Sequence, residues 1–208
     1  MSRLRIAPVV EGHGEDNAVQ ILLQRIWIEL LGGEHIDVLK PLRVSKLKLI
    51  QPRELSRTIE LAVRNLRLRT GVSKDPDMVL ILLDADQDAP CLLGPKLLEI
   101  ARAQRSDADV ACVVANVEYE TWFVASARSL TEYLTISEHE VLPDAPEATR
   151  LGKGWIQRRR DKYSETVHQP AMTRAMDLAL CRSKSPSFDK LCRDLEARLQ
   201  RIGAPSER

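Results

Sequence analysis

Apolar residues along the chain form two kinds of pattern, continuous runs and helically spaced positions. Residues 4–10, 78–83 and 109–115 are near-continuous apolar runs of strand length, and residues 36–39 are a shorter one. A strand that is apolar at nearly every position is typical of a parallel sheet covered on both faces. We therefore expect these four segments to pair in a mainly parallel sheet.

Between and after these runs, apolar residues recur every three or four positions, which predicts helices. The predicted helices span residues 18–31, 52–69, 92–105, 118–127, 164–181 and 187–202. Gly32-Gly33 ends the first of them, and Pro170 is expected to kink or delay the fifth. Alternating strands and helices predict an α/β fold with helices on both faces of the sheet.

The pattern changes after about residue 127, where strand-like runs cease. We expect residues 1–127 to form the α/β core, and residues 128–208 to form a basic loop and a helical annex packed on that core. The length of 208 residues and the hydrophobic content of 44% suffice for one generous domain with an annex.

Composition narrows the classes further. No apolar run approaches the roughly 18 residues of a membrane span, and the N-terminus lacks the apolar region of a secretory signal. We therefore expect a cytoplasmic protein without a membrane partner. The four cysteines form no C-x-x-C pair, which argues against a structural zinc site. The net charge of +1 neither identifies nor excludes a nucleic-acid binder.

Acidic residues follow three of the predicted strands. Glu11 follows the first, Asp84 and Asp86 follow the 78–83 run, and Glu118 lies after the last. Ligands of open parallel sheets bind outside the carboxyl ends of the strands, so these acids are expected to share one edge. Neighbouring carboxylates repel each other, and a hard cation such as Mg²⁺ relieves the repulsion. The alternative for Asp84 and Asp86 is a solvated, Asp-rich turn.

Two further acids belong to this set, each with a simpler explanation beside the functional one. Glu15 follows the Gly12–Gly14 turn and, taken alone, is better explained as a first-turn acid stabilised by the helix dipole. Glu120 lies two residues after Glu118 and faces the same edge, or else belongs to the first turn of a helix.

Basic residues cluster in two places, from Lys40 to Arg69 and from Arg150 to Lys162. A basic rim beside an acidic metal site suits a polyanion such as DNA or RNA, although a run of charge is usually a solvated face. The aromatic content of 4% argues against a stacking platform for single strands. The residues expected to bind nucleic acid are Lys153, Arg158, Arg159, Arg160 and Lys162.

Two motifs together resemble the TOPRIM fold of topoisomerases, bacterial primases and OLD-family nucleases. The first is a strand ending Val-Val-Glu-Gly-His-Gly-Glu (residues 9–15), and the second is a strand ending Leu-Leu-Asp-Ala-Asp (residues 82–86). Within that group the chain looks most like a bacterial family of about 200 residues that is often encoded beside SMC/ABC-like ATPases. The resemblance implies a TOPRIM-like sheet, Mg²⁺ or Mn²⁺ as cofactor, and a role in antiviral defence with an ATPase partner.

By that resemblance, Glu11 matches the glutamate after the first strand, and Asp84 and Asp86 match the D-x-D pair. Glu15 matches the second acid of nuclease-type members, and Glu118 and Glu120 match a further acidic position. Ala85 stands where many members have Gly, and the lysine of some OLD nucleases has no obvious counterpart unless Lys153 or Lys162 supplies it.

Two hypotheses follow. The first is a Mg²⁺-dependent nuclease with Glu11, Asp84 and Asp86 as catalytic residues and with Glu11, Glu15, Asp84, Asp86, Glu118 and Glu120 as metal ligands. The second is a non-catalytic subunit of an ATPase complex that binds metal or a partner. The sequence leaves the choice of DNA or RNA, the number of metal ions and a homo-oligomeric state open.

Overall fold

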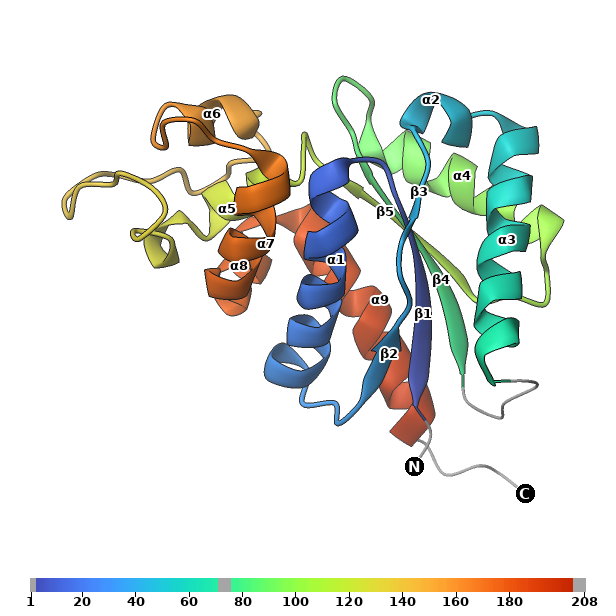
Figure 1. The fold of residues 1–208 in the computed structure, drawn as a ribbon. Coiled ribbons are helices and arrows are strands. Elements are labelled where there is room, and N and C mark those ends of the chain that lie inside the picture. The colour runs from blue at the N-terminus through green and yellow to red at the C-terminus, as the bar shows by residue number, and fades with distance from the viewer. Residues whose placement is uncertain (1–2, 71–75, 204–208) are drawn as a thin grey trace.

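A computed structural model describes residues 3–70 and 76–203 of the chain, and its centre is a parallel sheet (Figure 1). The strands are β1 (Leu4–Val10), β2 (Ile36–Val38), β3 (Leu42–Arg43), β4 (Asp77–Asp84) and β5 (Val110–Ala115). Their order is β2-β1-β4-β5, and β3 pairs with the end of β1. The predicted α/β class is confirmed.

The sheet forms because its strands are apolar on both faces. Every residue of β1 and of β5 is buried, and so is the interior of β4. The register pairs Val10 with Leu82 and Asp84 with Ala115, so β1, β4 and β5 end close to the same line. The acids that follow these strands therefore start from one edge of the sheet.

One face of the sheet is covered by α2 (Lys46–Leu49), α3 (Pro52–Thr70) and α4 (Pro90–Gln104). Alternate strand residues such as Val9, Ile81 and Val114 pack against them. These helices complete a hydrophobic layer to which, among the described residues, none after β5 contributes.

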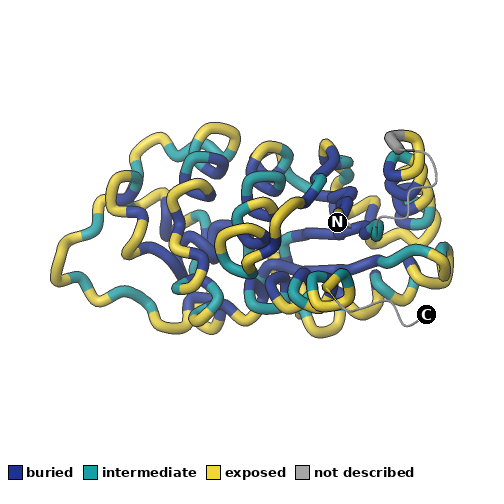
Figure 2. The backbone as a smooth tube through the Cα atoms, turned by 90° about the horizontal axis from the view of Figure 1, so that it is seen from below, coloured by how far each residue is buried: buried dark blue, intermediate teal, exposed yellow. Residues whose placement is uncertain are grey.

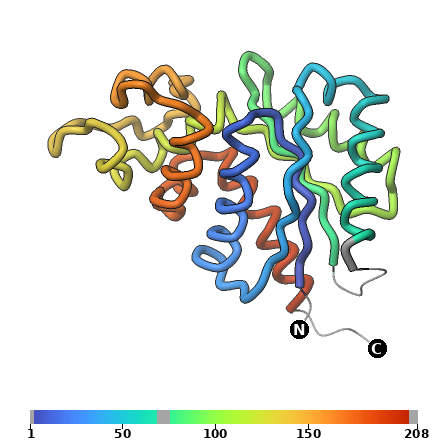
Figure 3. Tube along the Cα trace, viewed as in Figure 1, coloured from blue at the N-terminus to red at the C-terminus, as the bar shows by residue number. Residues whose placement is uncertain are grey.

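The opposite face is covered by α1 (His13–Arg25) and α9 (Pro186–Gly203). Behind them lie α5 (Glu120–Ala125), α7 (Glu165–Ala175) and α8 (Leu178–Lys184). The helices α1 and α7 run side by side although about 150 residues separate them along the chain (Figure 3). Figure 2 shows the buried strands between these two helical layers.

Two predicted helices differ from the observed ones by more than two residues or by a break. The predicted helix at 164–181 is two helices, because the chain is extended at Met176 and Asp177 begins α8 by accepting the N–H of Leu180 at 2.9 Å. The predicted helix at 18–31 begins earlier, at His13, and its last turn is the π-helical η1 (Ile26–Leu30).

The C-terminal helices share their core with the sheet. The predicted boundary at 127/128 falls inside the short η2 (Ala127–Ser129), and Phe188 and Leu195 of α9 lie in the same hydrophobic cluster as Ile6 and Leu80.

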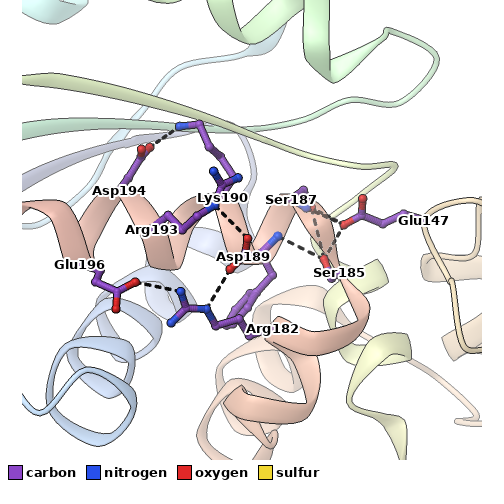
Figure 4. A network of polar contacts seen from close by, with 10 residues as sticks. Glu147, Arg182, Ser185, Ser187, Asp189, Lys190, Arg193, Asp194 and Glu196 are labelled. Atoms are coloured by element: carbon purple, nitrogen blue, oxygen red, sulfur yellow. Dashed lines mark hydrogen bonds and ion pairs between the residues drawn. The ribbon is translucent and has the colours of Figure 1, made fainter.

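Side-chain contacts tie this region together (Figure 4). The buried Glu147 accepts hydrogen bonds from Ser185 and Ser187 at the start of α9, and Arg182 of α8 bridges Asp189 and Glu196 of α9.

Within the described ranges, no helix combines the length and apolarity that crossing a membrane requires.

Candidate active site at the carboxyl edge of the sheet

The glycine turn after β1 places Glu15 inside the protein. Gly12 precedes the first helical residue of α1, and the Glu15 carboxylate accepts the N–H groups of Gly12 at 3.0 Å and Glu11 at 3.1 Å. Only 4% of Glu15 is exposed. Glu15 therefore lies in the first turn of α1, as the helix-dipole explanation expects. It is also buried, and its carboxylate is directed back toward the end of β1.

The end of β4 and the start of α5 contribute two more acids. The Asp84 carboxylate accepts the N–H of Tyr119 at 2.8 Å, which ties β4 to the segment after β5. Glu118 accepts the N–H of Lys153 at 2.6 Å, at the start of α6 (Lys153–Gln157). A side chain at Gly152 would collide with the Glu118 carboxylate, so glycine is needed there for this approach.

Glu120 is the most enclosed of the acids, with 2% of the residue exposed. Its Oε1 accepts hydrogen bonds from the Tyr163 hydroxyl at 2.9 Å and from the Gln169 amide at 3.1 Å. Gln169 belongs to α7, whose close approach to α1 depends on Gly14, because a Cβ there would lie 2.6 Å from Gln169 Cδ.

Gln169 carries an unsatisfied polar atom. Its Oε1 is buried and has no hydrogen-bond partner among the described residues, which is uncommon for a buried polar group. Sequence reasoning assigned Gln169 and Tyr163 no role at the acids, because each lies more than 40 residues along the chain from Glu120.

We call Glu15, Asp84 and Glu120 the interior acids, since their electrostatics set them apart. The pKa of Glu15 is raised to about 7: burial is the largest cause, the charges of Glu120 and Glu11 add to it, and the backbone hydrogen bonds from Gly12 and Glu11 oppose it. Burial also raises the pKa of Asp84 well above its usual value, with Glu15 and Glu120 adding to the effect. Burial raises the pKa of Glu120 as well. Three acids whose ionisation is disfavoured thus lie near one another at the carboxyl edge of the sheet.

Asp86 and Asp88, which we call the rim acids, have a different environment. Both pair with the Lys46 ammonium at 2.9 Å, and Lys46 also donates to the carbonyl of Ala85 at 2.6 Å. Burial alone would lower the pKa of Lys46, but the hydrogen bonds to Asp86 and Asp88 outweigh burial and raise it. Asp86 and Asp84 therefore have different partners, although both belong to the D-x-D motif.

Glu11 lies between the two groups. It accepts the N–H of Lys46 at 3.2 Å, and burial raises its pKa, with Asp86 adding a smaller increase. Sequence reasoning did not single out Lys46, which reads as one more cation in a basic run. Only the topology, which places the β3–α2 segment beside the ends of β1 and β4, identifies it.

The acids are near one another but do not form a finished metal cage. Across residues 3–70 and 76–203, no three His, Cys, Asp or Glu side chains lie close enough to hold one ion. The interior acids are instead held by the backbone N–H groups and side chains described above. Their donor atoms are all carboxylate oxygens, which is the ligand chemistry that Mg²⁺ and Mn²⁺ prefer.

The residues expected to bind nucleic acid have varied environments. Three are engaged within the protein: Lys153 pairs with Glu165, Arg159 with Glu140, and Arg160 donates to the carbonyl of Tyr133. Arg158 and Lys162 are exposed.

The fold and this edge define an α/β protein with an enclosed group of acids where its parallel strands end. The family model described as "Domain of unknown function (DUF4276)" matches residues 10–196, which is most of the chain, so the protein belongs to the DUF4276 family. No curated protein and no solved structure matches the chain.

Proposed function

We propose that this protein is a Mg²⁺-dependent hydrolase of phosphodiester bonds in nucleic acid. The observation that carries the proposal is the gathering of Glu15, Asp84 and Glu120 at the carboxyl edge of a parallel sheet, with Glu15 and Glu120 buried, Asp84 partly buried and the pKa of each raised. Strongly perturbed acids of this kind gather at functional sites more often than elsewhere. The motif resemblance to TOPRIM nucleases points to the same residues.

The donor set fits a hard divalent cation. Glu15, Asp84 and Glu120 would hold the ion, with Glu118 and Glu11 at the margins of the group. A bound cation would lower the pKa of a coordinated water and stabilise charge on a phosphoryl oxygen. Because no three acids among the described residues are within coordinating reach of one ion, the side chains would have to turn toward it.

The protein's own groups have defined tasks in this proposal. Tyr163 and Gln169 hold Glu120 in place, and the unsatisfied Oε1 of Gln169 offers an acceptor for a water proton. Glu11 is half-buried and its raised pKa favours holding a proton, which suits a general acid or base.

The test is a cleavage assay with Mg²⁺ or Mn²⁺ on plasmid DNA, single-stranded DNA and RNA. Asp84→Asn should abolish cleavage, because it removes one charged ligand while its amide oxygen can still accept the Tyr119 N–H. Asp88→Asn is the matched control, since it makes the same chemical change in an exposed acid of the adjacent loop. Thermal unfolding should show both variants folded. Cleavage by Asp84→Asn at the wild-type rate would refute the assignment.

A second candidate is a non-catalytic subunit of an ATPase complex. The observation in its favour is that the acids already have partners: Lys46 pairs with both rim acids, and backbone N–H groups donate to Glu15 and Asp84. Absence of cleavage by the wild-type protein with either metal, together with co-purification with an SMC/ABC-like ATPase, would favour this candidate over the nuclease.

A further inference from the structure

Two segments of the chain are rich in Lys and Arg, and their side chains differ in how many contacts they make within the protein. The first basic segment, residues 40–53, holds five Lys or Arg residues and no acid. The second basic segment, residues 150–162, holds six Lys or Arg residues and one Asp. By sequence alone the second segment is the denser one.

In the second segment most of the Lys and Arg side chains contact other groups of the protein. Four of its six cations contact other groups: Arg150 the carbonyl of Asp86, Lys153 the carboxylate of Glu165, Arg159 the carboxylate of Glu140 and Arg160 the carbonyl of Tyr133. Arg159 also lies over the Trp155 ring at 3.7 Å. A cation that already has an acidic partner or a fixed role gains less from binding a phosphate, because it must give up that contact.

In the first segment the balance is reversed. Lys46 is the only buried cation of the five, and it serves the rim acids. The other four are exposed, and none forms an ion pair with an acid of the described residues; they are Lys40, Arg43, Lys48 and Arg53. The Arg43 guanidinium contacts the His13 ring. These four exposed cations therefore carry positive charge that no ion pair within the described residues engages.

This surface adjoins the acidic site directly. Arg43 pairs with Val10 in the β1–β3 register, one residue before Glu11. The backbone N–H of Lys46 donates to the Glu11 carboxylate, and Lys48 lies in the same turn of helix α2. Figure 1 shows β3 and α2 at the end of the sheet where α1 begins. A chain of phosphates bound on this surface would therefore pass beside the acids.

We propose that the first basic segment binds the phosphate backbone of nucleic acid, with Lys40, Arg43, Lys48 and Arg53 as its contacts. The ligand chemistry is the phosphodiester backbone shared by DNA and RNA, since Lys and Arg contacts to phosphate position a nucleic acid without reading its sequence. This inference rests on the proposed function for its choice of polyanion. It moves the binding surface from the second basic segment, where sequence density placed it, to the first.

The experiment measures binding of fluorescein-labelled duplex DNA, single-stranded DNA and RNA by anisotropy, with a chelator present so that no cleavage occurs. Two double variants remove the same charge: Arg43→Gln/Lys48→Gln in the first segment and Arg158→Gln/Lys162→Gln in the second. All four residues are exposed, so both variants should fold. The first pair should weaken binding roughly tenfold or more and lower the slope of log K against log salt by about 0.9 per lost duplex contact. The second pair should change affinity less than about twofold.

The outcomes separate this inference from the proposed function. Equal losses in the two double variants, a larger loss in the second, or no binding by the wild-type protein would overturn the inference. Binding through the first segment with no cleavage by the wild type would leave the inference standing and refute the hydrolase. Cleavage by the wild type, unaffected by Arg43→Gln/Lys48→Gln, would do the reverse.

Discussion

Asp84 and Asp86 are two residues apart, yet they belong to environments with opposite electrostatics. Asp84 is grouped with Glu15 and Glu120, where burial and like charges oppose ionisation. Asp86 lies with Asp88 on the rim, where Lys46 offsets their charge and about half of each side chain is exposed. The difference teaches that a D-x-D motif specifies neither a shared partner nor a shared dielectric environment. Ionising the interior acids would destabilise the folded protein, whereas the ionised rim acids are stabilised by their ion pairs with Lys46.

The largest expected effect is on the pH dependence of stability, and it comes from the interior acids. The pKa of Glu15 is about 7 in the folded protein and 4.5 as its ordinary value, so the folded state binds the proton more tightly. Stability should therefore fall as pH rises from about 4.5 to 7 and level off above that. From Glu15 alone the loss is about 3 kcal/mol. Glu15→Gln should reduce this slope by the share of Glu15 in urea unfolding measured across that range, while Asp84 and Glu120, whose pKa values are also raised, keep the remainder.

The matched control for Glu15→Gln is Asp16→Asn, which removes the same charge from the same helical turn of α1. It should leave the slope of the wild type intact. A Glu15→Gln protein with the wild-type slope would show that Glu15 ionises freely, and the interior acids would then be no different from the rim.

An intermediate effect is expected on the rim, from Lys46. Lys46→Met removes the partner of both rim acids and of the Ala85 carbonyl, and should cost about 1–2 kcal/mol of unfolding free energy at pH 7. Because the pKa of Lys46 is raised from 10.5, its contribution is complete below that pH and is lost only at more alkaline values. Lys48→Met, an exposed change in the same helix, is the control. Equal stability of the two variants would contradict the rim pairing.

The smallest effect is expected from either rim acid alone. Asp86→Asn or Asp88→Asn should each cost less than about 1 kcal/mol, since the side chains are partly exposed and Lys46 keeps the other partner. The double variant should lose more than the sum of the single losses, because only then is Lys46 left without an acid. Strict additivity in a double-mutant cycle, measured by denaturant unfolding, would mean that the two acids do not share the lysine.

The strands were the most predictable part of the fold. β1 matches its predicted bounds, β4 extends one residue further at each end, and β5 begins one residue later, because buried parallel strands are continuous apolar runs with sharp polar limits. The break between α7 and α8 was missed, since Met176 continues the helical apolar pattern and only the capping role of Asp177 reveals the turn.

The sequence predicted only those parts of the candidate site whose position follows from the ends of the strands. The topology brings Glu11, Asp84 and the acids after β5 to one edge, as strand-end reasoning requires. The roles of Lys46 and Gln169 depend on how β3, α2 and α7 pack, and periodicity carries no information about such long-range contacts. The split between Asp84 and Asp86 likewise depends on the Lys46 ammonium, which reaches the rim from another part of the chain.

The packing of α9 over the sheet has a consequence for how this protein can be divided. Phe188, Leu191 and Leu195 are fully buried, and α9 contacts both β1 and β5. A fragment that stops after α5 would expose to water the part of the sheet face that α9 covers and would lack the Tyr163 and Gln169 contacts to Glu120. The last third of the chain is therefore needed with the first third in any expressed fragment. A chimaera of two relatives would have to take both of these parts from the same parent.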